Sequence, residues 1–193
     1  MTEVVFDSTK YTNAKELKFC LHEFIDANLY DVLLYLDTDI VVRSDISTLF
    51  QYFRKNTFVG HIEYPYKSMA AVSALGGLGG YEIPLSAYFS PCINTGVFLV
   101  DTKLLPSVLM KWKKMRDSWP RKGKFYDQPA FNALVSEGQI EFEAFPPYIV
   151  SLDFPIQLNL DQRIADHIFR DKTRALEKMK ETLAKLESAE TLS

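Results

Sequence analysis

A short apolar segment that ends in two carboxylates constrains the fold of this 193-residue chain more than any other feature. Residues 30–35, with the sequence YDVLLY, are β-rich and apolar on both sides of the strand pleat, which is typical of a central strand covered on both faces. Asp37 and Asp39 follow almost at once. A strand covered on both faces belongs to a sheet between helical layers, so the segment predicts an α/β layer fold.

Other segments alternate between strand and helix character. The apolar pattern predicts strands at residues 2–8, 56–64, 93–101 and 140–151, and helices at 12–28, 46–55, 102–119 and 126–138. Residues 73–84 are dense in glycine and predict a loop. No linker or repeat divides the chain, so we expect one domain over residues 1–193, with 161–193 as a C-terminal helical segment packed on it.

The charge balance argues against two classes of partner. Lys and Arg number 22 against 25 Asp and Glu, a formal net charge of −3, so there is no broad basic field to attract nucleic acid or an anionic membrane. The sequence also has no apolar run of about 18 residues and no signal-peptide pattern. We therefore expect no nucleic-acid partner, no membrane segment in this chain, and a soluble protein placed in the cytoplasm by default.

The acid pair has a specific chemical requirement. On a strand, residues i and i+2 point to the same face, so Asp37 and Asp39 can aim at one spot while Thr38 faces away. Two like charges held together are costly unless a cation or proton lies between them. Hard oxygen ligands favour Mg²⁺ or Mn²⁺, whose shells are commonly completed by substrate phosphates. The alternative is that the pair caps the following turn or helix.

Three motifs in a fixed order carry a resemblance. They are YLDTDIVVRSDISTLF, CINTGVFLVD and FYDQPAFNAL. In this order and spacing the chain, from about Lys15 to His167, resembles the GT-A-fold glycosyltransferases with a DxD motif, most closely the glycogenin- and galactinol-synthase-like retaining family. The resemblance implies a Rossmann-like, mixed and mostly parallel sheet flanked by helices. Because only 36 residues precede Asp37, we expect part of that fold's N-terminal nucleotide-binding unit to be missing.

The resemblance also implies residue roles. Asp37, Asp39 and His167 are implied ligands of a divalent metal, Mn²⁺ or Mg²⁺, that clamps the diphosphate of a UDP-sugar. Asp127 and Gln128 are implied catalytic residues that contact the donor sugar near the reacting carbon. The other expected donor- or acceptor-binding positions are Lys18, Thr38, Asn94, Thr95 and Gly96. From the residues alone, Asp127 is also suited to capping the helix that follows it, a role that does not exclude a donor contact, and His167 is equally suited to lying on the surface of a helix.

The function implied is transfer of a sugar, with retention, from a nucleotide-diphosphate donor, with a UDP-sugar favoured, to a hydroxyl of a carbohydrate or glycoprotein acceptor. One alternative is a haloacid-dehalogenase-like phosphatase with Asp37 as nucleophile and Asp39 as general acid. That family also needs a late GDxxxD motif, and no Gly-Asp dipeptide occurs in this sequence. A catalytically inactive GT-A-like binding module is the other alternative, because binding needs fewer intact parts than catalysis.

Overall fold

The computed structural model describes residues 14–63, 88, 92–118, 127–147, 149–152, 164–167 and 175–190. The largest element is a four-stranded sheet with the order β1-β4-β3-β5. Its strands are β1 (Val32–Leu36), β3 (Phe58–Ile62), β4 (Ile93–Asp101) and β5 (Phe142–Ala144). β4 is antiparallel to both β1 and β3, and β3 is parallel to β5. The predicted mixed sheet is therefore confirmed, but two of the three strand pairs described in it are antiparallel, because β4 lies between β1 and β3, so the expectation of mostly parallel pairing is wrong for this part of the chain.

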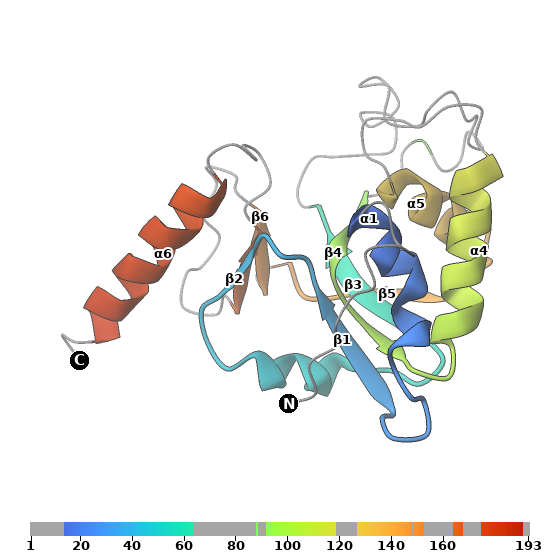
Figure 1. Ribbon diagram of the computed structural model, residues 1–193, viewed down its shortest axis with the longest axis horizontal. Coiled ribbons are helices and arrows are strands. Elements are labelled where there is room, and N and C mark those ends of the chain that lie inside the picture. The colour runs from blue at the N-terminus through green and yellow to red at the C-terminus, as the bar shows by residue number, and fades with distance from the viewer. Residues whose placement is uncertain are drawn as a thin grey trace.

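A smaller sheet and several helices complete the described fold (Figure 1). The second sheet has the order β2-β7-β6. Its strands are β2 (Ile40–Val42), β6 (Val150–Leu152) and β7 (Ala165–His167). The α-helices are α1 (Ala14–Leu17), α4 (Leu105–Ser118), α5 (Gln128–Ser136) and α6 (Ala175–Glu190), and the 3-10 helices are η1 (Lys18–Glu23) and η2 (Ile46–Tyr52). No helix in these described ranges is long and apolar enough to cross a membrane.

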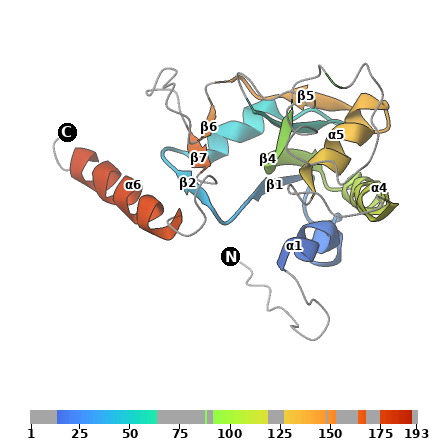
Figure 2. The same cartoon turned by 90° about the horizontal axis from the view of Figure 1, so that it is seen from above.

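The four-stranded sheet separates two apolar cores. Phe98 and Val100 of β4 belong to the core under η1, α4 and α5, whereas Val97 and Leu99 belong to the core under η2 and the second sheet. Figure 2 shows α1 and α4 on one side of this sheet and the second sheet on the other. Side chains alternate across a strand, so burial on both faces explains why residues 97–100 of β4 are apolar without interruption.

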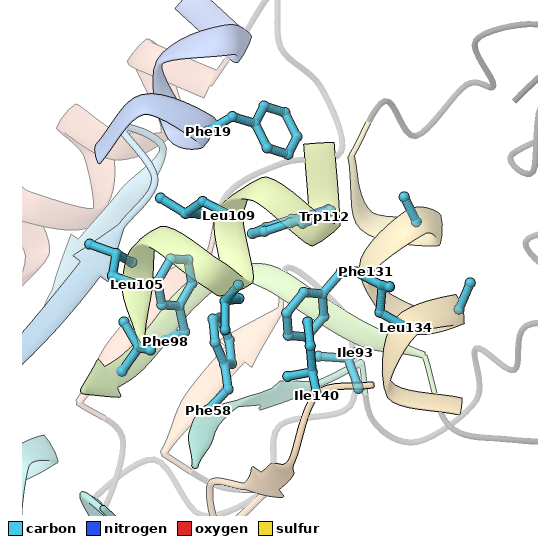
Figure 3. Packing of buried hydrophobic residues seen from close by; sticks show 14 of the residues in the cluster. Phe19, Phe58, Ile93, Phe98, Leu105, Leu109, Trp112, Phe131, Leu134 and Ile140 are labelled. Atoms are coloured by element: carbon cyan, nitrogen blue, oxygen red, sulfur yellow. The ribbon is translucent and has the colours of Figure 1, made fainter. Parts of the chain in front are cut away.

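Aromatic side chains fill the first core (Figure 3). The ring centroid of Phe58 lies 4.4 Å from that of Phe98 and 4.5 Å from that of Phe131. Trp112 of α4 lies 4.8 Å from Phe131 and 5.2 Å from Phe19 of η1. Because Phe131 belongs to α5, this one cluster fixes the two helices and η1 against the sheet, and these elements carry several of the expected site residues.

Four expectations about the elements are wrong or incomplete. The strand expected at 140–151 is two strands, β5 and β6, which belong to different sheets. β1 lies at the end of the described part of the sheet, with half-buried side chains, rather than at its centre. The tail is not helical from residue 161, because residues 165–167 pair with β2 and β6, and such tertiary pairing overrides a local helical pattern. Residues 12–28 form a short α-helix and then a 3-10 helix within the described range. The expected strand at 2–8 and loop at 73–84 lie outside the described residues.

Candidate active site

Three strand ends meet at one edge of the four-stranded sheet. The amide of Asp37, which follows β1, donates to the carbonyl of Gly96 near the start of β4 at 2.7 Å. The amide of Glu63, which follows β3, donates to the carbonyl of Cys92 at 2.8 Å. The carboxyl ends of β1 and β3 therefore adjoin the amino end of β4, in the position where open α/β sheets commonly bind ligands.

Asp37 and Asp39 lie in a turn and not in a strand. β1 ends at Leu36, β2 begins at Ile40, and the amide of Ile40 donates to the carbonyl of Asp37 at 3.2 Å. The i, i+2 alternation of a strand therefore does not set their directions, and that part of the sequence argument fails. Thr38, between them, is exposed to solvent.

Lys18 of η1 joins three segments at this edge. Its ammonium lies 2.9 Å from Oδ2 of Asp127 and 3.2 Å from Oδ1 of Asp37, and it donates to the carbonyl of Thr95 at 3.1 Å. Burial alone lowers the pKa of this ammonium, but the carboxylates of Asp127 and Asp37 outweigh that effect and raise its pKa above the ordinary 10.5. Lys18 is therefore a fully charged, buried cation beside the acid pair.

Asp127 is directed into the site rather than to its own helix. It occupies the N-cap position of α5, but its side chain makes no capping hydrogen bond. Its Oδ2 instead accepts from the hydroxyl of Thr95 at 3.2 Å as well as from Lys18. Burial alone raises the pKa of this carboxyl, yet Lys18 outweighs it, so the pKa lies below the ordinary 3.8. The geometry thus decides against the simple capping role for Asp127.

A pH-dependent contribution to stability follows. Because the pKa of Asp127 is lower in the folded than in the unfolded chain, its ionised form stabilises the fold above about pH 4 and loses that effect as the pH falls through the folded pKa. We expect Asp127→Asn to lower the free energy of unfolding at pH 7 and to show a smaller deficit near pH 3, below the ordinary pKa of the carboxyl. Urea denaturation of both proteins at the two pH values measures it; an equal deficit at both would contradict the ion pair.

Glu63 gathers the amide side chains of the site. Its Oε1 accepts from Nδ2 of Asn94 at 3.2 Å and from Nε2 of Gln128 at 2.8 Å, and all three side chains are buried. Nε2 of Gln128 also contacts Sγ of Cys92 at 3.0 Å. Oδ1 of Asn94 accepts from the amide of Gly96 at 2.8 Å. Sequence reasoning missed Glu63, although an acid at the end of a predicted strand was the same signal that singled out Asp37.

Tyr35 is a second residue that the sequence analysis did not assign to the site. Its hydroxyl donates to Oδ1 of Asp37 at 2.6 Å, and its ring stacks on Phe98 with centroids 4.7 Å apart. The ammonium of Lys18 lies 5.0 Å from the same ring centroid. Burial, and to a smaller extent the nearby charge of Asp37, raises the pKa of Tyr35 above its ordinary value. The phenol therefore stays protonated and can donate to the carboxylate.

The backbone of His167 lies near the turn that holds the other two expected metal ligands, Asp37 and Asp39. β2 and β7 are antiparallel, and Ile40 of β2 pairs with His167 of β7. The backbone of His167 therefore lies opposite the residue that directly follows Asp39. Among the side chains that the structure describes, no three His, Cys, Asp or Glu gather as a metal site. The side chain of His167 lies outside that description. Its backbone forms a strand and not the expected helix, because residues 165–167 pair with β2 and β6.

The chain matches a family model described as Glycosyl transferase family 8 over residues 5–144. The chain belongs to this family. It is therefore a glycosyltransferase, and at family level the reaction is transfer of a sugar from a nucleotide-sugar. This membership confirms the resemblance drawn from the three motifs and decides against the phosphatase alternative. A search of curated proteins found no match.

Solved structures show the same GT-A fold. A glycosyltransferase involved in glycosylation of the major capsid of PBCV-1 aligns with a TM-score of 0.58 and 18% identity, covering 93% of this chain and 81% of that one. The galactosyltransferase LgtC, in complex with donor and acceptor sugar analogues, gives 0.57 and 18%, covering 86% and 65%. Mouse xyloside xylosyltransferase 1 gives 0.51 and 14%, covering 79% and 61%. The chain thus spans less than two thirds of the second and third structures.

Proposed function

We propose that this chain transfers a sugar, with retention, from a UDP-sugar to a hydroxyl of a carbohydrate or glycoprotein acceptor, with the help of Mn²⁺ or Mg²⁺. The observation that carries the proposal is the junction of Lys18, Asp37, Thr95 and Asp127, which brings residues of three motifs and a helix together at the carboxyl edge of the sheet. The family match supports nucleotide-sugar chemistry for such an edge.

The polar groups of the edge suit a sugar diphosphate. The Lys18 ammonium can release one of its carboxylate partners and bind a phosphate oxygen in its place. Asp127 supplies carboxylate oxygens that can accept hydrogen bonds from sugar hydroxyls. Its ion pair with Lys18, at 2.9 Å, keeps both side chains charged before a ligand binds. The amides of Asn94 and Gln128, oriented by Glu63, supply further donors and acceptors. Held in place before binding, these groups can orient the anomeric carbon toward an acceptor.

The residues present fit a divalent metal. Asp37 and Asp39 offer hard carboxylate oxygens in one turn, and the backbone of His167 lies opposite Ile40. A carboxylate has about four lone-pair directions, so Asp37 can accept from Tyr35 and Lys18 and still bind an ion. GT-A glycosyltransferases generally use such an ion, which when bound supplies Lewis-acid stabilisation of charge on the leaving diphosphate.

Calorimetry with a panel of UDP- and GDP-sugars tests this function. We expect one UDP-sugar to bind in the presence of Mn²⁺ and to lose affinity at least roughly tenfold when a chelator removes the metal. Incubating that donor with candidate hydroxyl acceptors and following the anomeric proton by NMR reports both transfer and its stereochemistry. Affinity that a chelator leaves unchanged would rule out the metal-bridged donor, and an inverted product would rule out retention.

A further inference from the structure

Arg116 is a buried cation that lies outside the polar edge described above. Its side chain is only 2% exposed. The guanidinium donates to both carboxylate oxygens of Glu16, from Nη1 at 2.8 Å and from Nη2 at 3.0 Å. Nε and Nη2 also donate to Oδ1 of Asp117 at 2.9 and 2.7 Å. The bidentate ion pair of Arg116 with Glu16 fixes the relative orientation of the two side chains as well as their separation.

Two of the residues that Arg116 contacts lie on either side of Lys18 in the sequence. Glu16, in α1, precedes Lys18 by two residues, and Phe19 follows it directly. The guanidinium carbon lies 4.3 Å from the centroid of the Phe19 ring, a cation–π contact. Arg116 therefore holds the short α1–η1 segment from both sides of the lysine that reaches the proposed donor site.

Trp112, one helical turn earlier on α4, holds the other partner of that lysine. Its indole Nε1 donates to the carbonyl of Asp127 at 2.8 Å. Its ring meets Phe19 edge-on, with centroids 5.2 Å apart, and Figure 3 shows the Phe19 ring above that of Trp112. The ammonium of Lys18 lies 5.9 Å from the Trp112 ring centroid. One face of α4 thus fixes both ends of the Lys18–Asp127 ion pair.

We propose that Arg116 is a positioning residue that, through Glu16, sets the place of the Lys18 ammonium in the donor site. A lysine has a long flexible side chain, so a defined place for its charge requires a fixed backbone segment. A buried ion pair often adds little net stability to a fold, because taking both charges out of water costs about as much as their attraction returns. Fixing the orientation of the α1–η1 segment is therefore the stronger reason for this pair. The consequence for donor binding rests on the proposed function, whereas the placement of Lys18 does not.

The placement of Lys18 can be observed without any substrate. Hydrogen bonds to Asp127 and the Thr95 carbonyl protect the Lys18 ammonium protons, so ¹H–¹⁵N NMR of ¹⁵N-lysine protein should show their signal, assigned by its loss in Lys18→Met. We expect Glu16→Gln and Arg116→Lys to broaden or remove this signal. An unchanged signal in a folded Glu16→Gln protein would overturn the proposal; this variant keeps Arg116 paired with Asp117 in case Arg116 itself is needed for folding.

Lys113→Gln is the matched control. Lys113 lies on the same helix and forms an ion pair with the same Asp117 at 2.7 Å, but both side chains are largely exposed. We expect the Lys18 signal of this variant to match that of the wild type. Loss of the signal in the control as well would show a general loosening of α4 and would overturn the specific role of Arg116.

A double-mutant cycle then measures the effect on the donor, with UDP and Mn²⁺ as the probe. We expect Glu16→Gln to weaken UDP affinity roughly tenfold in the wild-type background. In the Lys18→Met background the same change should alter affinity by about twofold or less, because its target is gone. Equal losses in both backgrounds would overturn the proposal. If wild type binds no UDP while the NMR result holds, the proposed function fails and the positioning role stands.

Discussion

Asp39→Ala is expected to reduce sugar transfer by roughly a thousandfold or more, because it removes one of the proposed carboxylate ligands of the metal that would stabilise the leaving diphosphate. Mn²⁺ should no longer strengthen donor binding in this variant. Transfer kinetics over a range of Mn²⁺ concentrations, together with calorimetry of UDP with and without metal, measure both effects. The fold should persist, since Asp39 lies in the turn between β1 and β2 and not in either apolar core.

Asp45→Ala is the control for that change. Asp45 lies six residues further along the chain, where its side chain accepts from the amide of Ser47 at 2.9 Å and caps η2. Removing it takes away a carboxylate of the same type from the neighbouring surface without touching the acid pair. Transfer should stay close to that of wild type. If Asp39→Ala kept a metal response equal to that of Asp45→Ala, the assignment of Asp39 would be wrong.

Trp112→Ala is expected to lower the free energy of unfolding by about 4 kcal/mol. The side chain is fully buried and contacts Phe19 and Phe131, so its removal leaves a cavity between η1, α4 and α5. It also removes the hydrogen bond to the carbonyl of Asp127. Urea denaturation at pH 7 measures the change, and donor affinity should fall with it because both partners of the Lys18–Asp127 pair lose their support.

Two further substitutions separate packing from hydrogen bonding. Trp112→Phe keeps an aromatic ring but removes the indole N–H, and we expect a smaller loss of about 2 kcal/mol. Met110→Ala, at a side chain 67% exposed on the same helix, should change stability by no more than about 0.5 kcal/mol. A Trp112→Ala protein as stable as Met110→Ala would contradict the central place of Trp112 in the first core.

Several elements were readable from local pattern because their periodicity is strong. The strand at residues 93–101 has the predicted bounds, and its unbroken apolar run at 97–100 is what burial on both faces of a sheet requires. The helix expected at 102–119 is α4, with Leu105, Val108, Leu109 and Trp112 buried at helical spacing. The helix expected at 46–55 contains η2, whose first residue follows the capping residue Asp45.

Residues 165–167 show where local pattern fails. They form a strand because β2 and β6 supply hydrogen-bond partners from distant parts of the chain, and no periodicity within the segment records those partners. β1 illustrates the same limit. Its side chains pack on the cores of both faces, as its apolar sequence predicted, but the described part of the sheet places it at one end and not at the centre.

The sequence by itself determined the family, the α/β class and the motif residues Asp37, Asn94, Asp127 and Gln128, because these depend on residue type, order and spacing along the chain. Only the tertiary structure decided which groups touch. It turned Asp127 away from its helix and toward Lys18, placed Glu63 between two amides, and brought Arg116 to Glu16 across a hundred residues. Such contacts arise from how distant elements pack, and no local pattern encodes the direction of a side chain between them.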